Sequence, residues 1–244
     1  MALKPACERC SAPLSHETAV FACTYGCTFC RACTDALGFR CPNCSGILFD
    51  RNRATIAVAT ATEALAVHRA MPGARVCETG VGLATYAGPF GESVVSCGLA
   101  GGLREGVPSG TVIVPRAVRR PDGTTLHCDD ALSARLADAS RRLGFEPLLD
   151  PMITAEAIVN GAARAEWARL GYAGVDMETG LLDAPRVAAV RVVLDTPQRE
   201  LSDEWIQPAR ALRNPRNWPQ ALWLARHAPR YARRAAQVIA LAQV

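Results

Sequence analysis

The spacing of the cysteines restricts the fold of this chain more than any other feature of its sequence. Eight of the eleven cysteines lie within the first 44 residues, and they are Cys7, Cys10, Cys23, Cys27, Cys30, Cys33, Cys41 and Cys44. A module this short buries too little apolar surface to be stable without cross-links. The stretch "MALKPACERC" lacks the charged-then-apolar layout of a secretory signal, so we expect a cytoplasmic protein whose thiols stay reduced. The expected cross-link is therefore a metal ion.

Zinc is the ion that this pattern favours. A Cys-x2-Cys pair places two thiolates within reach of one ion, and four thiolates complete a tetrahedral structural site, so eight cysteines suit about two zinc ions. Thiolates would fill every position of each site and leave none open for catalysis. We therefore expect a structural module or a docking surface.

The segments "CTYGCTFCRAC" and "CPNCSG" resemble a small cysteine-rich domain family of unknown function, and the spacing is similar to a RING-like cross-brace. A cross-brace would give one zinc to Cys7, Cys10, Cys30 and Cys33 and the other to Cys23, Cys27, Cys41 and Cys44. Simple sequential pairing of the cysteines is the alternative.

The rest of the chain reads as an α/β domain. Short apolar strands ending in glycines or acids alternate with segments of helical spacing, such as "DDALSARLADASRRLGF", where Asp129 or Asp130 is the expected cap. Half of the residues are apolar, and the apolar runs are too short to span a bilayer. We expect three parts: a zinc module over 1–48, an α/β domain over 53–205 and a basic helical tail over 206–244.

Four motifs in order resemble the nucleoside phosphorylase and nucleosidase superfamily: "TGVG", "CGLAGGL" with "SGTVIVP", "VDMETG" and "VRVVLD". The resemblance covers about residues 54–205 and is nearest to hopanoid-associated phosphorylases, through "RVVLDTPQRELS" and the basic tail. It implies a three-layer domain with a mixed central sheet. It also implies cleavage of the N-glycosidic bond of a purine nucleoside, which in the hopanoid-associated relatives is lipid-linked.

The same resemblance implies three catalytic residues. Asp195 would protonate or hydrogen-bond the purine at N7, and burial at a strand end would help it to hold a proton. Glu63 stands where nucleosidases place the acid that orients the attacking water; an acid at a helix start is its alternative. Arg191 stands near the nucleophile, where it could hold a phosphate co-substrate in two hydrogen bonds or pair with an acid.

Substrate contacts are implied at a second set of positions. Glu178 would accept hydrogen bonds from the ribose hydroxyls, although an acid there also suits a helix cap. Met177 would pack against the sugar, and Ile158 stands where many relatives stack an aromatic ring on the purine. The whole implied set is Glu178, Met177, Gly80, Gly98, Gly101, Gly102, Ile158 and Val159.

The C-terminal segment carries the net positive charge, with eight arginines and three acids from Arg199 onward. Such a helix can lie at the inner membrane surface, or it can pack on the domain with its basic face in solvent. It has no groove-reading or base-stacking motif, so we expect no nucleic-acid partner. We also expect a homo-oligomer. The competing function is a catalytically degenerate binding protein organised by the zinc module.

Overall fold

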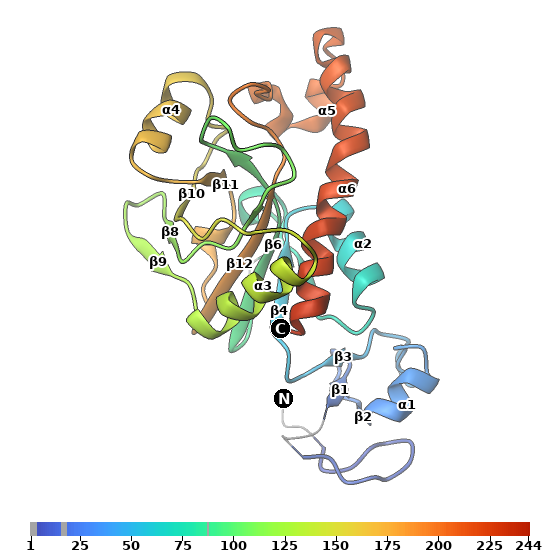
Figure 1. Ribbon diagram of the computed structural model, residues 1–244. Coiled ribbons are helices and arrows are strands. Elements are labelled where there is room, and N and C mark those ends of the chain that lie inside the picture. The colour runs from blue at the N-terminus through green and yellow to red at the C-terminus, as the bar shows by residue number, and fades with distance from the viewer. Residues whose placement is uncertain (1–3, 16–18, 87) are drawn as a thin grey trace.

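The computed structural model describes residues 4–15, 19–86 and 88–244. A small cysteine-rich module lies at the bottom of Figure 1, with the α/β domain above it. The module has a three-stranded antiparallel sheet of order β2-β1-β3 and one helix. Its elements are β1 (Val20–Ala22), β2 (Thr28–Cys30), α1 (Arg31–Ala36) and β3 (Phe49–Asp50). Because β3 pairs with β1, the module continues to Asp50, past the boundary expected at residue 48.

The module packs on the loop that follows α2 (Ala61–Ala70) of the domain. The Asp50 backbone N–H donates to the Gly73 carbonyl at 3.1 Å. A Cβ atom at Gly73 would lie 2.6 Å from the Phe39 ring and 3.2 Å from the Phe21 ring. Glycine therefore lets two aromatic rings of the module close over the end of α2.

The domain is built on a mixed sheet, in which nine strands are described. The strands are β4 (Thr55–Val58), β5 (Val76–Glu78), β6 (Ser93–Gly102), β7 (Val112–Ile113), β8 (Ala117–Arg119), β9 (Thr125–His127), β10 (Met152–Thr154), β11 (Gly174–Asp176) and β12 (Arg186–Val193). The long strand β6 pairs in parallel with β4 and β12, and its last residues pair antiparallel with β11. The ends of β4, β6 and β12 therefore meet at one edge, where ligands gather in sheets of this type.

Helices cover this sheet. They are α2, α3 (Asp130–Arg142), α4 (Gly161–Arg169), α5 (Pro208–Ala211) and α6 (Trp218–Ala242), with short 3-10 turns η1 (Val81–Leu83), η2 (Thr179–Leu181), η3 (Asp203–Ile206) and η4 (Pro215–Asn217). Alternate residues of β4, β6 and β12 pack with α2, α3 and α6 in one core cluster. The Asp129 carboxylate accepts a hydrogen bond from the Leu132 N–H at 2.8 Å, which identifies Asp129 as the cap of α3.

The C-terminal segment belongs to the α/β domain rather than to a separate tail. In α6 the residues Tyr231, Ala235, Val238 and Ile239 are buried in the main core cluster, and the helix runs beside α2 in Figure 1. The packed-helix alternative therefore describes its C-terminal part. Its first turns remain open, where the side chains of Trp218 and Leu222 are 60% and 76% exposed.

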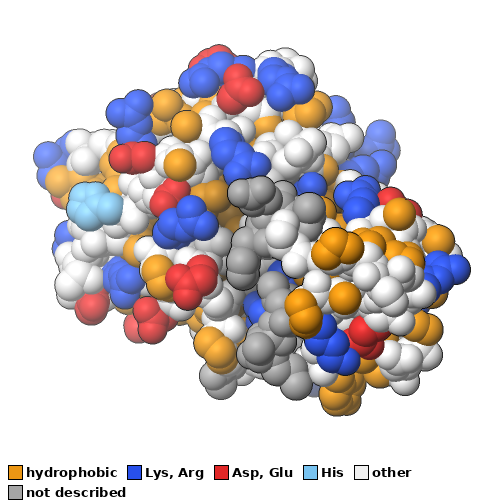
Figure 2. Space-filling model, turned by 90° about the horizontal axis from the view of Figure 1, so that it is seen from below, with side chains coloured by type: hydrophobic (Ala, Val, Ile, Leu, Met, Phe, Trp, Pro, Cys, Tyr) orange, Lys and Arg blue, Asp and Glu red, His pale blue; other side chains and the backbone are white. Residues whose placement is uncertain are grey.

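The expected α/β domain with a mixed central sheet and a cysteine-rich module before it is confirmed. The motif "SGTVIVP" contains the two-residue strand β7, and β8 follows it after a break. No helix in the described residues is long and apolar enough to cross a membrane. On the face seen in Figure 2, basic side chains are interspersed with acidic and apolar ones.

Candidate active site and candidate metal centres

A cavity of about 410 Å³ opens at the carboxyl ends of β4, β6, β11 and β12. The charged residues of its lining are Glu63, Arg164, Asp176, Glu178, Arg191 and Asp195. All six are buried, which is unusual for charged side chains unless they are paired. The cavity therefore holds the most concentrated set of buried charges among the described residues.

Arg191 organises one end of the cavity. It lies on β12, is 2% exposed, and its Nη2 lies 2.8 Å from Asp176 Oδ2 and 3.3 Å from Glu178 Oε2. The same nitrogen donates to Ser96 Oγ at 2.6 Å. Arg191 thus pairs with an acid, which was one of its two expected states, and Asp176 is its nearest carboxylate.

Glu63 faces this arginine from the first turn of α2. Its Oε2 accepts a hydrogen bond from the Thr60 N–H at 2.9 Å, and the Glu63 N–H donates to the Thr60 hydroxyl oxygen at 3.4 Å; these two bonds form a capping box. Its Oε1 accepts one bond, from the Leu99 N–H at 3.0 Å. Burial raises the pKa of Glu63, while Arg191 and these donors oppose the rise. Glu63 therefore caps the start of α2 and also lines the cavity.

Glu178 completes this end. Its Oε1 accepts a hydrogen bond from the Gly82 N–H at 3.2 Å, and its side chain does not cap the turn η2 that follows. Burial raises the pKa of Glu178 to about 7; Arg191 lowers it, whereas Asp176 and Glu63 add to the rise. Three carboxylates thus share a single guanidinium.

Asp195 lies at another side of the cavity, directly after β12. It is buried, as expected, and its Oδ2 pairs with Nη2 of Arg164, which is on α4 and is 2% exposed. The pairing was not expected. The role expected of Asp195 at the purine stays a prediction.

The uncharged residues expected at the site divide into two groups. Met177, Ile158, Val159 and Gly101 line the cavity. The other three glycines are not among the lining residues, and they serve packing: a Cβ at Gly98 would overlap Glu63 Oε1, one at Gly102 would lie 2.9 Å from Val193, and one at Gly80 would lie 2.9 Å from Thr85.

One wall of the cavity is apolar and comes from the C-terminal segment. It consists of Leu201, Trp205, Ile206, Pro208, Leu224 and Ala228. The Trp205 indole N–H donates to Gln220 of α6 at 2.7 Å, which ties the turn η3 to the helix. Residues 206–244 therefore contribute both to the core and to the site.

Sequence reasoning missed Asp176, Arg164 and Ser96. Asp176 had a usable signal, since it precedes Glu178 by two residues at a strand end and thus points to the same face. Arg164 had none, because an arginine in a helix of nine residues is most often exposed.

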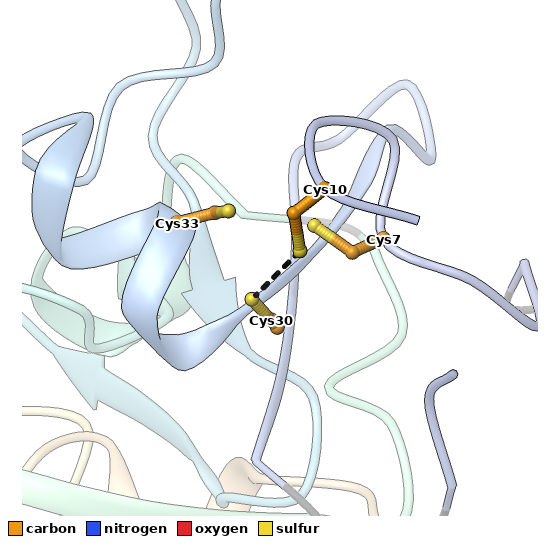
Figure 3. A group of neighbouring side chains, drawn as sticks. All are labelled: Cys7, Cys10, Cys30 and Cys33. Atoms are coloured by element: carbon orange, nitrogen blue, oxygen red, sulfur yellow. Dashed lines mark hydrogen bonds between the residues drawn. The ribbon is translucent and has the colours of Figure 1, made fainter. Parts of the chain in front are cut away.

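The cysteines form two groups in the module. The sulfurs of Cys7, Cys10, Cys30 and Cys33 lie within 4.8 Å of one another, and Figure 3 shows the four side chains converging. The Cys10 and Cys30 sulfurs are 3.8 Å apart. This is the grouping of the cross-brace, and sequential pairing would not produce it.

The second group contains Cys23, Cys27 and Cys41. Cys44 lies beside them, because a Cβ at Gly46 would contact both the Cys44 sulfur at 3.3 Å and Cys23 at 3.9 Å. Soft sulfur donors in tetrahedral number suit zinc. Both groups therefore fit structural zinc by donor type and proximity.

Comparison with known proteins describes the module first. Residues 1–54 match the sequence model of a family described as a protein of unknown function, DUF1272. An uncharacterised protein of Rhizobium meliloti (strain 1021) is 42% identical over 53 residues, which are 21% of this chain and 63% of that protein. The match thus spans less than two thirds of the relative, and it concerns the module alone.

The α/β domain is similar to solved nucleosidase structures. A 5′-methylthioadenosine/S-adenosylhomocysteine nucleosidase from Neisseria meningitidis is 16% identical with a TM-score of 0.57, over 78% of this chain and 99% of that one. Futalosine hydrolase of Helicobacter pylori is 10% identical with a TM-score of 0.57, over 78% and 96%. A 5′-methylthioadenosine-bound nucleosidase mutant from Helicobacter pylori is 11% identical with a TM-score of 0.54, over 77% and 96%. At these identities the likeness shows the fold.

Proposed function

We propose that the α/β domain hydrolyses the N-glycosidic bond of a purine nucleoside. The observation that carries the proposal is the arrangement of Glu63, Glu178 and Arg191 at one end of a cavity that also contains Asp195. Cleavage of this bond builds positive charge on the ribose and electron density on the base. The carboxylates of Glu63 and Glu178 can stabilise the positive charge on the ribose, and Asp195 can hydrogen-bond the base.

Glu63 would orient and deprotonate the attacking water. Its Oε1 accepts a single protein hydrogen bond and keeps a lone pair for water, and its raised pKa suits a base that works near neutral pH. Glu178 would accept the ribose hydroxyls, with Met177 against the sugar. As the C1′–N9 bond breaks, its electron pair passes to the purine, which takes a solvent proton and a hydrogen bond to Asp195.

Water suits this site better than phosphate. Arg191 is already bound by Asp176 and Glu178, with Glu63 close by, so three carboxylates outnumber one guanidinium. A phosphate dianion would meet net negative charge in a buried place, where such repulsion is screened least. The arginine that was considered as a phosphate ligand is occupied by the protein's own acids.

The apolar wall points to a nucleoside that carries an apolar substituent. Leu201, Ile206 and Leu224 offer such a group an apolar surface. A lipid-linked nucleoside of the adenosylhopane type is the finer form of this proposal. The exposed Trp218 and Leu222 would then contact the bilayer together with nearby arginines. A lipid-linked substrate would be supported if the protein cleaved a nucleoside anchored in vesicles and the rate of cleavage fell as the salt concentration rose.

Purine release from adenosine and from a 5′-alkylthio analogue tests the activity. We expect equal release with and without phosphate, and stronger turnover of the analogue. Glu63→Gln should lower kcat by about 100-fold or more, while Glu92→Gln, at an exposed carboxyl, is the matched control. A requirement for phosphate would refute hydrolysis. Absence of release would favour the binding-protein alternative.

We propose that the module carries two structural zinc ions. Each would be held by four cysteines, and the module would fold around them and fasten the end of α2. Zinc would supply no chemistry to the cavity, because thiolates occupy every ligand position.

A further inference from the structure

The carboxylate of Asp195 is held from one side only. Its Oδ2 pairs with Arg164, whereas its Oδ1 accepts no hydrogen bond from any described residue, although the residue is only 6% exposed. This oxygen is not fully buried, so it is accessible from the cavity. Because Asp195 lines the cavity, a ligand in the cavity is the available source of a donor.

Arg164 cannot easily leave this position. Its Nε donates to the Val159 carbonyl at 3.0 Å and its Nη1 donates to the Gly102 carbonyl at 3.1 Å. The Glu200 carboxylate lies 3.7 Å from Nε on the far side. The guanidinium thus joins the ends of β6 and β12 to the start of α4, and a movement away from Asp195 would leave buried carbonyls without donors.

A carboxylate held in a fixed position distinguishes between bases by the hydrogen-bond donors and acceptors that they present. The guanidinium of Arg164 donates to Oδ2 of Asp195, and the other carboxylate oxygen, Oδ1, remains as an acceptor. On the edge that contains N7, a 6-aminopurine offers an N–H donor at the 6-position, whereas a 6-oxopurine offers two acceptors. Two acceptors facing a carboxylate repel it.

We propose that Arg164 is a specificity-determining residue, which makes the site accept 6-aminopurines and reject 6-oxopurines by holding Asp195 as a one-sided acceptor. The proposal rests on the proposed function for its substrate. Its physical basis, a free acceptor oxygen fixed by a buried cation, does not depend on turnover.

The ratio of kcat/KM for adenosine to that for inosine tests the proposal. We expect a ratio of about 100 or more in the wild-type protein, since a site with a buried polar group rejects the ligand that leaves it unpaired. Arg164→Met removes the group that fixes the Asp195 carboxylate, so Oδ1 can turn away from the base and the ratio should fall at least 10-fold. Arg164→Lys keeps a cation and should keep most of the ratio. Arg169→Met, at a side chain 70% exposed on the same helix, is the matched control.

A merely structural arginine would give a different result, because its loss would lower both rates and leave the ratio unchanged. That outcome, or equal rates for adenosine and inosine in the wild-type protein, would overturn the proposal. Calorimetric binding of free adenine and hypoxanthine covers the case in which the protein cleaves neither nucleoside. A preference for adenine that is lost in Arg164→Met would uphold the role of Arg164 even if the proposed hydrolysis fails, and equal affinities would overturn it.

Discussion

The cysteine module and the cavity of the α/β domain both gather negatively charged groups, but they neutralise them differently. In the module, the sulfurs of Cys7, Cys10, Cys30 and Cys33 converge within 4.8 Å of one another, and a metal ion is the proposed counter-charge. In the cavity, three carboxylates surround Arg191, which the fold itself supplies. The first cluster needs an ion from solution. The second is complete without one, and it can therefore do chemistry with its acids instead of using them as ligands.

The largest test of this contrast is removal of the metal. We expect elemental analysis to find about two zinc ions per chain, and Cys10→Ser to lose about one of them. Structural zinc contributes about 10–16 kcal/mol of binding free energy in small peptides, more than a module of this size can replace. Chelation should therefore unfold the module and leave the α/β domain folded, which hydrogen exchange would resolve.

Cys77→Ser is the control for the metal, because Cys77 lies outside both clusters. If the purified protein contained no zinc and its eight module cysteines formed disulfides, the proposal that the module binds metal ions would be wrong.

The next test removes the built-in cation. Arg191→Met should lower the free energy of unfolding by about 3–5 kcal/mol, because it leaves buried carboxylates without their partner. Urea unfolding would measure the loss. Arg186→Met, at an exposed arginine on the same strand, should change stability by less than about 0.5 kcal/mol. Similar losses in the two variants would mean that Arg191 does not compensate the acids.

The smallest effect is a pH dependence. Burial raises the pKa of Glu178 to about 7 from its ordinary value of 4.5. Between these values the folded protein binds a proton that the unfolded chain has released, so this group's contribution to stability is lost as pH rises through that window. The difference of 7 − 4.5 = 2.5 units corresponds to roughly 3 kcal/mol at most.

Glu178→Gln cannot titrate, so its stability relative to the wild-type protein should improve as pH rises from 5 to 8. Urea unfolding across this range would measure the change, with Glu92→Gln as the exposed control. A relative stability that stays constant with pH would show that Glu178 does not hold a shifted proton.

The two regions also differ in how far the sequence predicts them. Cysteine spacing predicted the module because each ligand of a zinc ion usually has a second cysteine ligand within a few residues. The cross-brace grouping followed from the resemblance to a family pattern. The alternation of strands with helices, and a cap at Asp129 or Asp130, followed from periodicity and local chemistry. These are short-range relations, which a sequence displays directly.

The charge partners in the cavity were less accessible. Glu63, Glu178, Arg191 and Asp195 were expected at the site, yet the pairing of Asp195 with Arg164 joins residues that are 31 positions apart. Arginines on helices are usually exposed, so nothing in the sequence singled out Arg164, and the many arginines after Arg199 made α6 resemble a separate tail. Burial of these residues is decided by tertiary packing, which no local pattern records.

The position of α6 in the chain has a consequence for synthesis. This helix fills the core beside α2 and supplies Leu224 and Ala228 to the cavity, but it is translated after every strand of the sheet. A nascent chain that has completed β12 therefore displays the apolar face meant for α6, with its partner still inside the ribosome. Until α6 emerges, the intermediate is open to aggregation and to chaperones, and the cavity lacks the wall that this helix supplies. A messenger truncated before this helix would yield an aggregation-prone product without a complete cavity.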